Sequence, residues 1–355
     1  MSLLSINVGL NTNIGLRRKT NQDNLYAGNG VYVVCDGMGG GKGGERASAD
    51  AVWRLAQLAE RPRRNLDDIA AVLNQAQDDA LTLGEELGGV AGTTVTGVIL
   101  PTRVRQDGSS PDERCYIVNI GDSRTYHMDA GADGVWQSDS LVCITRDHSE
   151  RQEAIDTGRM LPEEASRRIP RNAITQCIGA PDGIRPDWYA APANGRFIIC
   201  SDGLHAQISS GEFADIVASC ANPQSAADRL VEAALQAGGS DNISVLVVDM
   251  RAECPSNAGW HAGKLGDDED IDDALEGTLH TLRAVSSWRW LSARTCRQYN
   301  SGQYNNKENT PWSTSMPRSR RCRIRTPIRH SSRESRTRIL SSERMSLRIR
   351  EHTRG

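Results

Sequence analysis

Four aspartates stand at the ends of apolar, strand-like runs in this chain, and a carboxylate in that place can do chemistry. They are Asp36, Asp122, Asp202 and Asp241. Taken singly, an Asp beside a Gly is typical of a turn, because Asp bonds its local backbone and Gly supplies a positive φ. Four carboxylates gathered at strand ends could not all stay ionised unless protons or cations neutralised them. The pattern therefore favours a metal site.

The available ligand types narrow the choice of metal. The chain has no HExxH motif, no CxxC pair and no pair of histidines at ligand spacing, which disfavours Zn²⁺. Oxygen-only ligation suits Mg²⁺ or Mn²⁺. Such ions at paired sites generate hydroxide from water near neutral pH and stabilise in-line displacement at phosphorus. Phosphoester hydrolysis is the predicted chemistry.

The glycine-rich stretch from 37 to 44 offers a competing interpretation. A Walker A loop would need GxxxxGK[ST], but Asp36 occupies its first Gly position and Gly43 its Ser/Thr position. GxGxxG is satisfied by Gly39, Gly41 and Gly44, so a dinucleotide-binding fold is a formal alternative. It is disfavoured because no second parallel strand with an acidic end follows.

Seven sequence blocks then occur in a diagnostic order between residues 15 and 242: GLRRKTNQD, VCDGMGG, GTT, NIGDSR, TRDHS, ICSDGL and GGSDN. This order resembles the metal-dependent protein phosphatases, the PPM or type 2C serine/threonine phosphatases, over residues 5–250. Met38 and the TRDHS block are similar to the bacterial branch, whose substrates are proteins phosphorylated by cytosolic Ser/Thr kinases.

The resemblance implies an α+β fold, a four-layer α-β-β-α sandwich of two antiparallel sheets flanked by helices. Metals would lie in the cleft at the sheet ends. The catalytic domain would span 1–252, with a flap at about 149–173, where Pro162 is suited to a first helical turn. A connecting loop with no substrate role is the alternative interpretation of the flap.

The resemblance also assigns metal ligands for two or three Mn²⁺ or Mg²⁺ ions. Asp36 would bridge two ions, and the carbonyl of Gly37 would bind the first. Asp202 and Asp241 would complete the second. Asp122, sharing Asp202, matches the additional metal position of bacterial members.

Two further residues receive catalytic roles from the resemblance. Asp23 would orient metal-bound water, and Arg18 would hold the substrate phosphate. The planar fork of Arg suits two phosphate oxygens better than the point charge of Lys. Without the resemblance, a solvated basic run from Arg17 to Lys19 would be the simpler interpretation.

Two other positions bear on the chemistry. Asp147 and His148 could form an acid–base pair, but a structural role beside the flap is favoured. Many bacterial members carry His directly after DGMGG, whereas this chain has Gly41 followed by Lys42. That departure leaves the general acid open, although a metal-bound water could serve.

Helix signals indicate elements that would cover the sheets. Asn65 is a predicted N-cap for an apolar stripe from 66 to 83. Ser209 with Glu212 forms a predicted capping box. Asn222-Pro223 opens another helix, which Gly238-Gly239 ends.

The end of the chain has a different composition. After about residue 252 the sequence becomes acidic and then Arg-rich, with thirteen arginines and no lysine after Met316. Residues 253–355 are predicted to be disordered, so a chain ending at Ala252 should keep its activity. The tail could be regulatory, could bind polyanions weakly, or could be an out-of-frame extension; no specific nucleic-acid partner is expected.

The expected location and partners of the protein rest on the lack of targeting or membrane-spanning patterns in the sequence and on the family resemblance. No apolar stretch of eighteen residues and no signal-peptide pattern occurs, so a cytoplasmic monomer without a membrane span is expected. Cys35, Cys115, Cys143 and Cys200 fall in or beside apolar runs, which predicts buried, reduced thiols. The predicted partners are phosphorylated proteins.

The favoured function is an active phosphoserine/phosphothreonine phosphatase that opposes a bacterial Ser/Thr kinase by attack of metal-activated water. A catalytically weak, phosphatase-like regulator that binds phosphoproteins is the alternative. Retention of all four aspartates favours the active enzyme.

Overall fold

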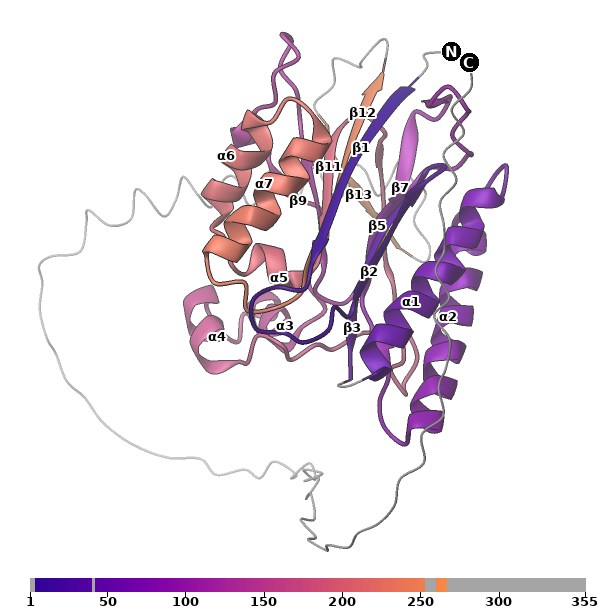
Figure 1. Ribbon diagram of the computed structural model, residues 1–355, viewed down its shortest axis with the longest axis vertical. Helices are drawn as coiled ribbons and strands as arrows, with labels where there is room; N and C mark the ends of the chain where they lie inside the picture. The colour runs from indigo at the N-terminus through magenta and orange to yellow at the C-terminus, as the bar shows by residue number, and fades with distance from the viewer. Residues whose placement is uncertain (1–3, 40–41, 253–259, 267–355) are drawn as a thin grey trace, which may run out of the picture. The chain divides into compact units, whose positions relative to one another are not determined.

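Two antiparallel β-sheets lie face to face, with helices along the outer side of each (Figure 1). The computed structural model describes residues 4–39, 42–252 and 260–266. In Figure 1, α1 and α2 follow one outer side of the sandwich, and α6 and α7 follow the other. The four-layer α-β-β-α arrangement predicted from the sequence is confirmed for these residues.

The first sheet has six strands in the order β6-β1-β12-β11-β8-β9, and all of its pairings are antiparallel. Their bounds are Ser109–Ser110 (β6), Leu4–Asn13 (β1), Ile243–Ala252 (β12), Gly195–Cys200 (β11), Arg124–Met128 (β8) and Val142–Cys143 (β9).

The second sheet has seven strands in the order β13-β10-β7-β5-β3-β2, with β4 paired to β3. Their bounds are Gly263–Leu265 (β13), Asp187–Pro192 (β10), Arg114–Ile120 (β7), Val95–Ile99 (β5), Val31–Met38 (β3), Asp23–Gly28 (β2) and Gly92–Thr93 (β4).

Three helices begin at the N-cap residues that the sequence predicted for them. Asn65 caps α2 in a full capping box with Asp68, Ser209 caps α6, and Asn222 caps α7. No helix in the described ranges is both long and apolar enough to cross a bilayer. The helical segments are α1 (Lys42–Ala56), η1 (Gln57–Glu60), α2 (Leu66–Leu87), η2 (Ser138–Ser140), α3 (Glu150–Asp156), α4 (Pro162–Arg168), α5 (Asp202–His205), α6 (Ser210–Ser219) and α7 (Pro223–Gln236).

The central strands are continuously apolar because both of their faces are buried. In β3, Val31 and Val33 belong to the core beneath α1 and α2, whereas Tyr32 and Val34 belong to the core between the sheets. Alternate residues of a strand point to opposite faces, so one run of apolar residues joins two cores. The residues of β12 divide in the same way between the core under α6 and α7 and the core between the sheets.

The outer edge of β1 is bonded by a side chain from a helix. β6 pairs only with Leu4 and Ser5, at one end of the strand. Further along, the amide of Gln224 on α7 accepts from Leu10 N at 3.1 Å and donates to Leu10 O at 2.9 Å. One amide group therefore makes both bonds that a neighbouring strand would make to this residue.

A buried arginine joins the hairpin of β2 and β3 to its surroundings. The two-residue turn Asn29-Gly30 has positive φ at both positions, 50° and 86°, as a type I′ turn requires. Nearby, Arg64 is 3% exposed. Its guanidinium donates to four backbone carbonyls, those of Asn29, Leu58, Leu100 and Thr102.

The ordered structure continues beyond residue 252, where the sequence placed the end of the domain. Trp260 stacks on His127 with ring centroids 3.5 Å apart, and its indole N–H donates to Pro192 O at 2.9 Å. β13 then pairs with β10, and Lys264 lies 2.8 Å from Asp187. The remaining residues of the predicted tail lie outside the described residues.

The cysteines follow their prediction with one exception. Cys35, Cys115 and Cys200 are buried, and all described cysteines are free thiols. Cys143 is exposed, so the prediction of burial is wrong there. The reason is its place on β9, a two-residue strand at the end of its sheet.

Candidate active site

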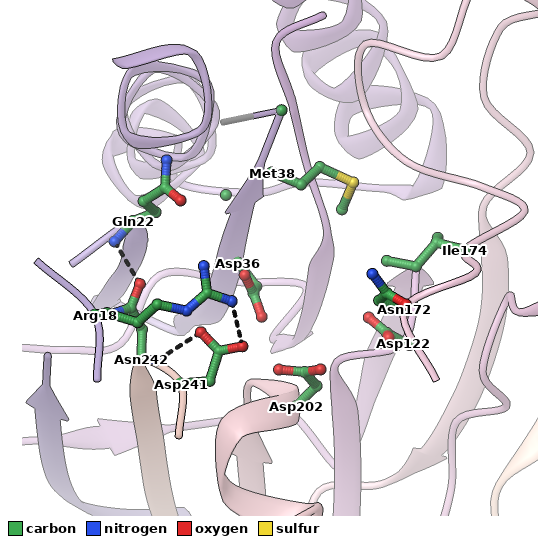
Figure 2. A pocket seen from close by; sticks show the side chains of 12 residues that line it. Arg18, Gln22, Asp36, Met38, Asp122, Asn172, Ile174, Asp202, Asp241 and Asn242 are labelled. Carbon is green, nitrogen blue, oxygen red and sulfur yellow. Dashed lines mark hydrogen bonds and ion pairs between the residues drawn. The ribbon is translucent and has the colours of Figure 1, made fainter. Parts of the chain in front are cut away.

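A cavity of about 240 Å³ lies where the ends of strands from both sheets meet. Figure 2 shows carboxylates from separate segments facing this common space. The lining residues are Arg18, Gln22, Asp36, Gly37, Met38, Gly39, Asp122, Asn172, Ile174, Asp202, Asp241 and Asn242. All of the predicted site residues except Asp23 are among them.

Four strands deliver the aspartates. Asp36 lies within β3, and Asp122 follows β7 after Gly121, whose φ is 107°. Asp202 begins α5, with only Ser201 between it and the end of β11, and Asp241 precedes β12. Because β3 and β7 belong to one sheet and β11 and β12 to the other, the site depends on both layers.

The GTT block fixes the backbone of Asp36. The Asp36 N–H donates to Thr94 Oγ1 at 3.0 Å, and the Asp36 carbonyl accepts from Thr94 N–H at 2.8 Å and from the Thr93 hydroxyl at 3.0 Å. The next residue, Gly37, packs so closely that a Cβ would overlap the Gly44 carbonyl. The glycine therefore allows the backbone of the DGMGG block to approach the N-terminal part of α1.

Asn242 organises the loop that carries Arg18. Its side chain accepts from Gln22 N–H at 2.9 Å and donates to the carbonyls of Ile14 and Thr20 at 2.9 and 3.0 Å. The Arg18 guanidinium then donates to Asp241 Oδ2 at 2.6 Å. The GGSDN block thus positions both ends of this ion pair, a role that the sequence did not reveal.

A second arginine, which the sequence analysis did not identify, meets the other end of the carboxylate cluster. Arg171 Nη2 lies 2.6 Å from the Asp202 carbonyl and 3.3 Å from its Oδ2. Arg171 belongs to the predicted flap, which contains α3 and α4. Asn172, in the same segment, and Ile174, just after it, line the cavity.

Asp23 lies behind the cavity. It pairs with Asp36 in the register of β2 and β3, and it is 5% exposed. Its Oδ2 accepts from the Ser201 hydroxyl at 2.8 Å, whereas no partner is found for the buried Oδ1 in the described part of the chain. Burial raises the pKa of Asp23 to about 6, against the hydrogen bonds from Ser201 and Ser244.

Burial and mutual repulsion raise the pKa of most of the cluster. The pKa of Asp36 lies well above its usual range, first through burial and then through the charges of Asp23 and Asp202. Burial followed by the charge of Asp202 raises the pKa of Asp122 to about 7. Burial also raises the pKa of Asp202, with Arg171 opposing it. The cluster therefore favours protons or cations over full negative charge.

The donor set fits hard divalent cations. Every side chain of the cluster offers carboxylate oxygen, and Gly37 lines the same cavity, so the donor set suits Mg²⁺ or Mn²⁺. Within residues 4–39, 42–252 and 260–266, no three acidic, imidazole or thiol side chains converge on one point. Mg²⁺ commonly keeps several waters among its ligands, so a sparse set of protein ligands is compatible with it.

Asp147 and His148 have structural contacts, in agreement with the favoured prediction. Asp147 accepts two bonds from Arg124, both at 2.7 Å. His148 Nδ1 accepts from Gly121 N–H at 3.3 Å, and its Nε2 faces Asp187 at 3.3 Å. These bonds fix the loop that leads to Asp122. Gly41, the departure from the bacterial pattern, lies outside the described residues.

Comparison with known proteins gives a consistent set of relatives. No protein-family model matches the chain. PhpP, a protein phosphatase of Streptococcus pneumoniae, is 31% identical over 261 residues, which cover 69% of this chain and 98% of PhpP. PstP, a serine/threonine protein phosphatase of Mycobacterium tuberculosis, is 31% identical over 243 residues. That match covers 66% of this chain but only 43% of PstP, so the chain spans less than half of that relative.

A solved structure agrees with these relatives. The catalytic domain of PstP in complex with two manganese ions superposes with a TM-score of 0.59 at 29% identity. The superposition covers 70% of this chain and 99% of that domain.

Proposed function

Because the chain belongs to the metal-dependent PPM family of bacterial serine/threonine protein phosphatases, we propose that it hydrolyses phosphoserine and phosphothreonine in proteins. The observation that carries the proposal is the convergence of four aspartates and Arg18 on one cavity. A cluster of mutually repelling carboxylates is costly to bury, and a divalent cation removes that cost.

We assign the residues as follows. Asp36, Asp202, Asp241 and the Gly37 carbonyl would hold two Mn²⁺ or Mg²⁺ ions, and Asp122 with Asp202 would hold a third where one binds. When bound, these ions supply Lewis acidity and a nucleophilic water for displacement at phosphorus. PstP, a relative with the same fold, was crystallised with two manganese ions.

The chain's own groups bind and orient the reactants. Arg18 lies at the cavity mouth with its side chain 49% exposed, where its planar fork can take two phosphate oxygens. Asp23 offers a buried oxygen without a partner among the described residues, suited to accept a hydrogen bond from the attacking water. Its raised pKa makes it a proton acceptor near neutral pH.

The proposed setting is the bacterial cytoplasm, where the enzyme acts as a monomer on substrates of a Ser/Thr kinase. Such substrates present one phosphorylated side chain on a flexible segment, which a cavity of this size can accept. Flap residues Asn172 and Arg171 lie beside the cavity and are placed to contact residues next to the phosphate.

The direct test is hydrolysis of p-nitrophenyl phosphate and of a phosphothreonine peptide, with and without Mn²⁺. We expect turnover only with Mn²⁺ or Mg²⁺, and its loss in excess EDTA. Asp36→Asn should lower kcat on the order of a hundredfold or more, with an unchanged circular dichroism spectrum.

Asp67→Asn is the matched control, because Asp67 is an exposed aspartate on α2 outside the cavity. Full activity in EDTA would overturn the metal-dependent mechanism. Mn²⁺-dependent binding of the phosphopeptide without turnover would instead support the non-catalytic, phosphoprotein-binding alternative.

A further inference from the structure

Strand β13 is linked to the loop that carries Asp122 by a series of polar side chains. Lys264 Nζ, on β13, lies 2.8 Å from Asp187 Oδ1 on β10. The other oxygen of that carboxylate, Oδ2, lies 3.3 Å from His148 Nε2. His148 Nδ1 in turn accepts from the Gly121 N–H at 3.3 Å. Asp122 comes next in the chain and lines the cavity (Figure 2).

The bond from Gly121 determines which nitrogen of His148 carries the hydrogen. A ring nitrogen that accepts a hydrogen bond carries no hydrogen, so in the neutral imidazole the hydrogen is on Nε2, which faces Asp187. An ionised carboxylate at Nε2 favours this tautomer. Although burial opposes it, the bonds from His148 and Lys264 lower the pKa of Asp187 to about 2. The ionised Asp187 therefore keeps Nδ1 available as an acceptor.

Gly121 has a backbone conformation that needs external support. Its φ is 107°, and a Cβ at this position would lie 2.6 Å from Thr94 Cγ2. Its carbonyl accepts from the His148 N–H at 2.9 Å and from the Asn119 side-chain amide at 3.2 Å. His148 thus bonds both the N–H and the carbonyl of Gly121, and these two bonds set the direction in which the chain enters Asp122.

The Lys264–Asp187 ion pair is placed to orient the carboxylate. The Asp187 side chain is 17% exposed and that of Lys264 is 49% exposed, so the pair is partly shielded from water. Lys264 occupies Oδ1, which leaves Oδ2 for His148 and for the Tyr189 hydroxyl, which donates to it at 3.4 Å. Each oxygen of the carboxylate therefore has its own partners.

We propose that Lys264 is a positioning residue for the cation held by Asp122, an inference that rests on the proposed function. Through Asp187 and His148, it keeps Gly121 in the conformation that turns the next carboxylate toward the cavity. Without the ammonium group, Oδ1 of Asp187 loses its partner and the carboxylate can turn. The tautomer with hydrogen on Nδ1 then becomes populated, and the Gly121 N–H loses its acceptor.

The experiment uses variants of the full-length chain. Lys264→Met removes the ammonium group and keeps an apolar stem, and Lys264→Arg restores a cation. Arg185→Met is the matched control, because it removes a positive charge two residues before Asp187. The Arg185 side chain is exposed and makes no hydrogen bond or ion pair with any residue that the structure describes.

A further variant interrupts the link at its centre. His148→Asn places an amide oxygen near the position of Nδ1 but is too short to reach Asp187. Mn²⁺ binding is measured by electron paramagnetic resonance, and the ion at Asp122 is identified as the one lost in Asp122→Asn. Ring nitrogen-15 chemical shifts of His148, measured without Mn²⁺, report which nitrogen carries the hydrogen.

The inference predicts coupled changes in metal binding and in the imidazole. Lys264→Met should bind the ion at Asp122 about threefold less tightly, as expected for loss of a partly exposed ion pair. Lys264→Arg should recover most of the affinity, and Arg185→Met should match the parent chain. In the His148→Asn background, Lys264→Met should have no further effect, because the link is already interrupted. The chemical shifts should show hydrogen on Nε2 in the parent chain and a mixture of tautomers in Lys264→Met.

Three outcomes would overturn the inference, and they differ in what they leave standing. If the parent chain binds Mn²⁺ but Lys264→Met changes neither the affinity nor the tautomer more than Arg185→Met does, the link is wrong and the proposed function stands. An equal loss of affinity with and without His148 would show that Lys264 acts through the sheet and not through the imidazole. If the parent chain binds no Mn²⁺ at all, the metal-dependent function fails and the role of Lys264 fails with it.

Discussion

The guanidinium of Arg18 faces a carboxylate on one side and the open cavity on the other. Its bond to Asp241 raises the pKa of Arg18, with burial opposing and the charge of Asp36 adding to the effect. A phosphate entering the cavity would offer it a second anion. Arg18 can therefore exchange partners, as long as a cation neutralises Asp241 when the guanidinium turns to substrate.

Replacing Arg18 tests this double role. Arg18→Ala should raise KM for p-nitrophenyl phosphate about tenfold or more, because a charge-assisted contact to phosphate is lost. Arg18→Lys should recover part of the loss, since charge returns without the fork. Steady-state kinetics at saturating Mn²⁺ measure both.

Arg17→Ala provides the comparison for these variants, because Arg17 is an exposed neighbour outside the cavity lining. An unchanged KM in Arg18→Ala would show that another group holds the phosphate.

Sequence motifs predicted roles for Arg18 and the aspartates of the site. They did not predict the roles of Asn242 and Arg171, which contact these residues. Asp36 and Asp202 each stand before a glycine at the end of an apolar run, a pattern formed by adjacent residues. The role of Asn242 depends on the backbone of residues more than two hundred positions away, and the role of Arg171 on a helix thirty-one positions on. Long-range contacts of polar side chains leave no periodic pattern, so they could not be predicted.

At the scale of elements, Arg64 connects several segments outside the site through four hydrogen bonds. It ties η1, the β2–β3 turn and the end of β5 through carbonyls that have little access to water. Arg64→Met keeps most of the volume but removes all of the bonds that the guanidinium donates to these carbonyls. We expect the free energy of unfolding to fall by about 3 kcal/mol or more, measured by urea denaturation.

Arg63→Met is the matched control for that variant, because Arg63 is the exposed neighbour in the same loop. Its effect should stay within about 0.5 kcal/mol. Equal losses in the two variants would mean that Arg64 contributes only charge and not its buried bonds.

Elements with local signals were predicted well. The Asn65 cap and the apolar stripe after it specify α2 from adjacent residues alone, and the structure begins the helix at Leu66. β13 has three residues and no alternating pattern. Its place in the sheet is set by Trp260, Lys264 and their distant partners, which explains why the sequence assigned this segment to the tail.

For the whole molecule, we propose that the catalytic unit ends after Gly266. A chain ending there should match the full chain in stability and activity. A chain ending at Ala252 would lose β13 and expose His127, so its free energy of unfolding should fall by roughly 3 kcal/mol, as expected for loss of a stacked indole and its bonds. This revises the sequence-based expectation that truncation at Ala252 is harmless.

Thermal unfolding and p-nitrophenyl phosphate turnover of the two truncated chains would check the boundary. Equal melting temperatures for the chains ending at 252 and 266 would show that residues 260–266 add nothing to the fold. Loss of activity in the longer chain would place essential residues further on.

The burial of His127 beneath Trp260 predicts how the stability of the fold depends on pH. Burial lowers the pKa of His127 to about 3, against its bond to the Asn194 carbonyl. In the unfolded chain, His127 binds a proton near pH 6.5, whereas in the folded chain it stays neutral down to about pH 3. The free energy of unfolding therefore falls as the pH drops from about 6.5 towards 3. His127→Phe keeps a ring against Trp260 but cannot titrate.

We expect the loss of stability between pH 7.5 and 5 to be roughly 2 kcal/mol smaller in His127→Phe than in the parent chain. Urea denaturation at the two pH values measures this difference. Parallel pH profiles would show that His127 is accessible to protons in the folded state.

The side-chain amide of Gln224 affects whether β1 can pair with a strand of another copy of the chain. A strand with unsatisfied backbone groups along one side can recruit another chain and begin ordered aggregation. Val8 and Leu10 are 37% and 41% exposed on β1, so this strand offers both the backbone groups and the apolar side chains that favour such recruitment. By occupying both backbone groups of Leu10, a single glutamine interrupts this row, so a strand from another copy would find no free partner at that residue.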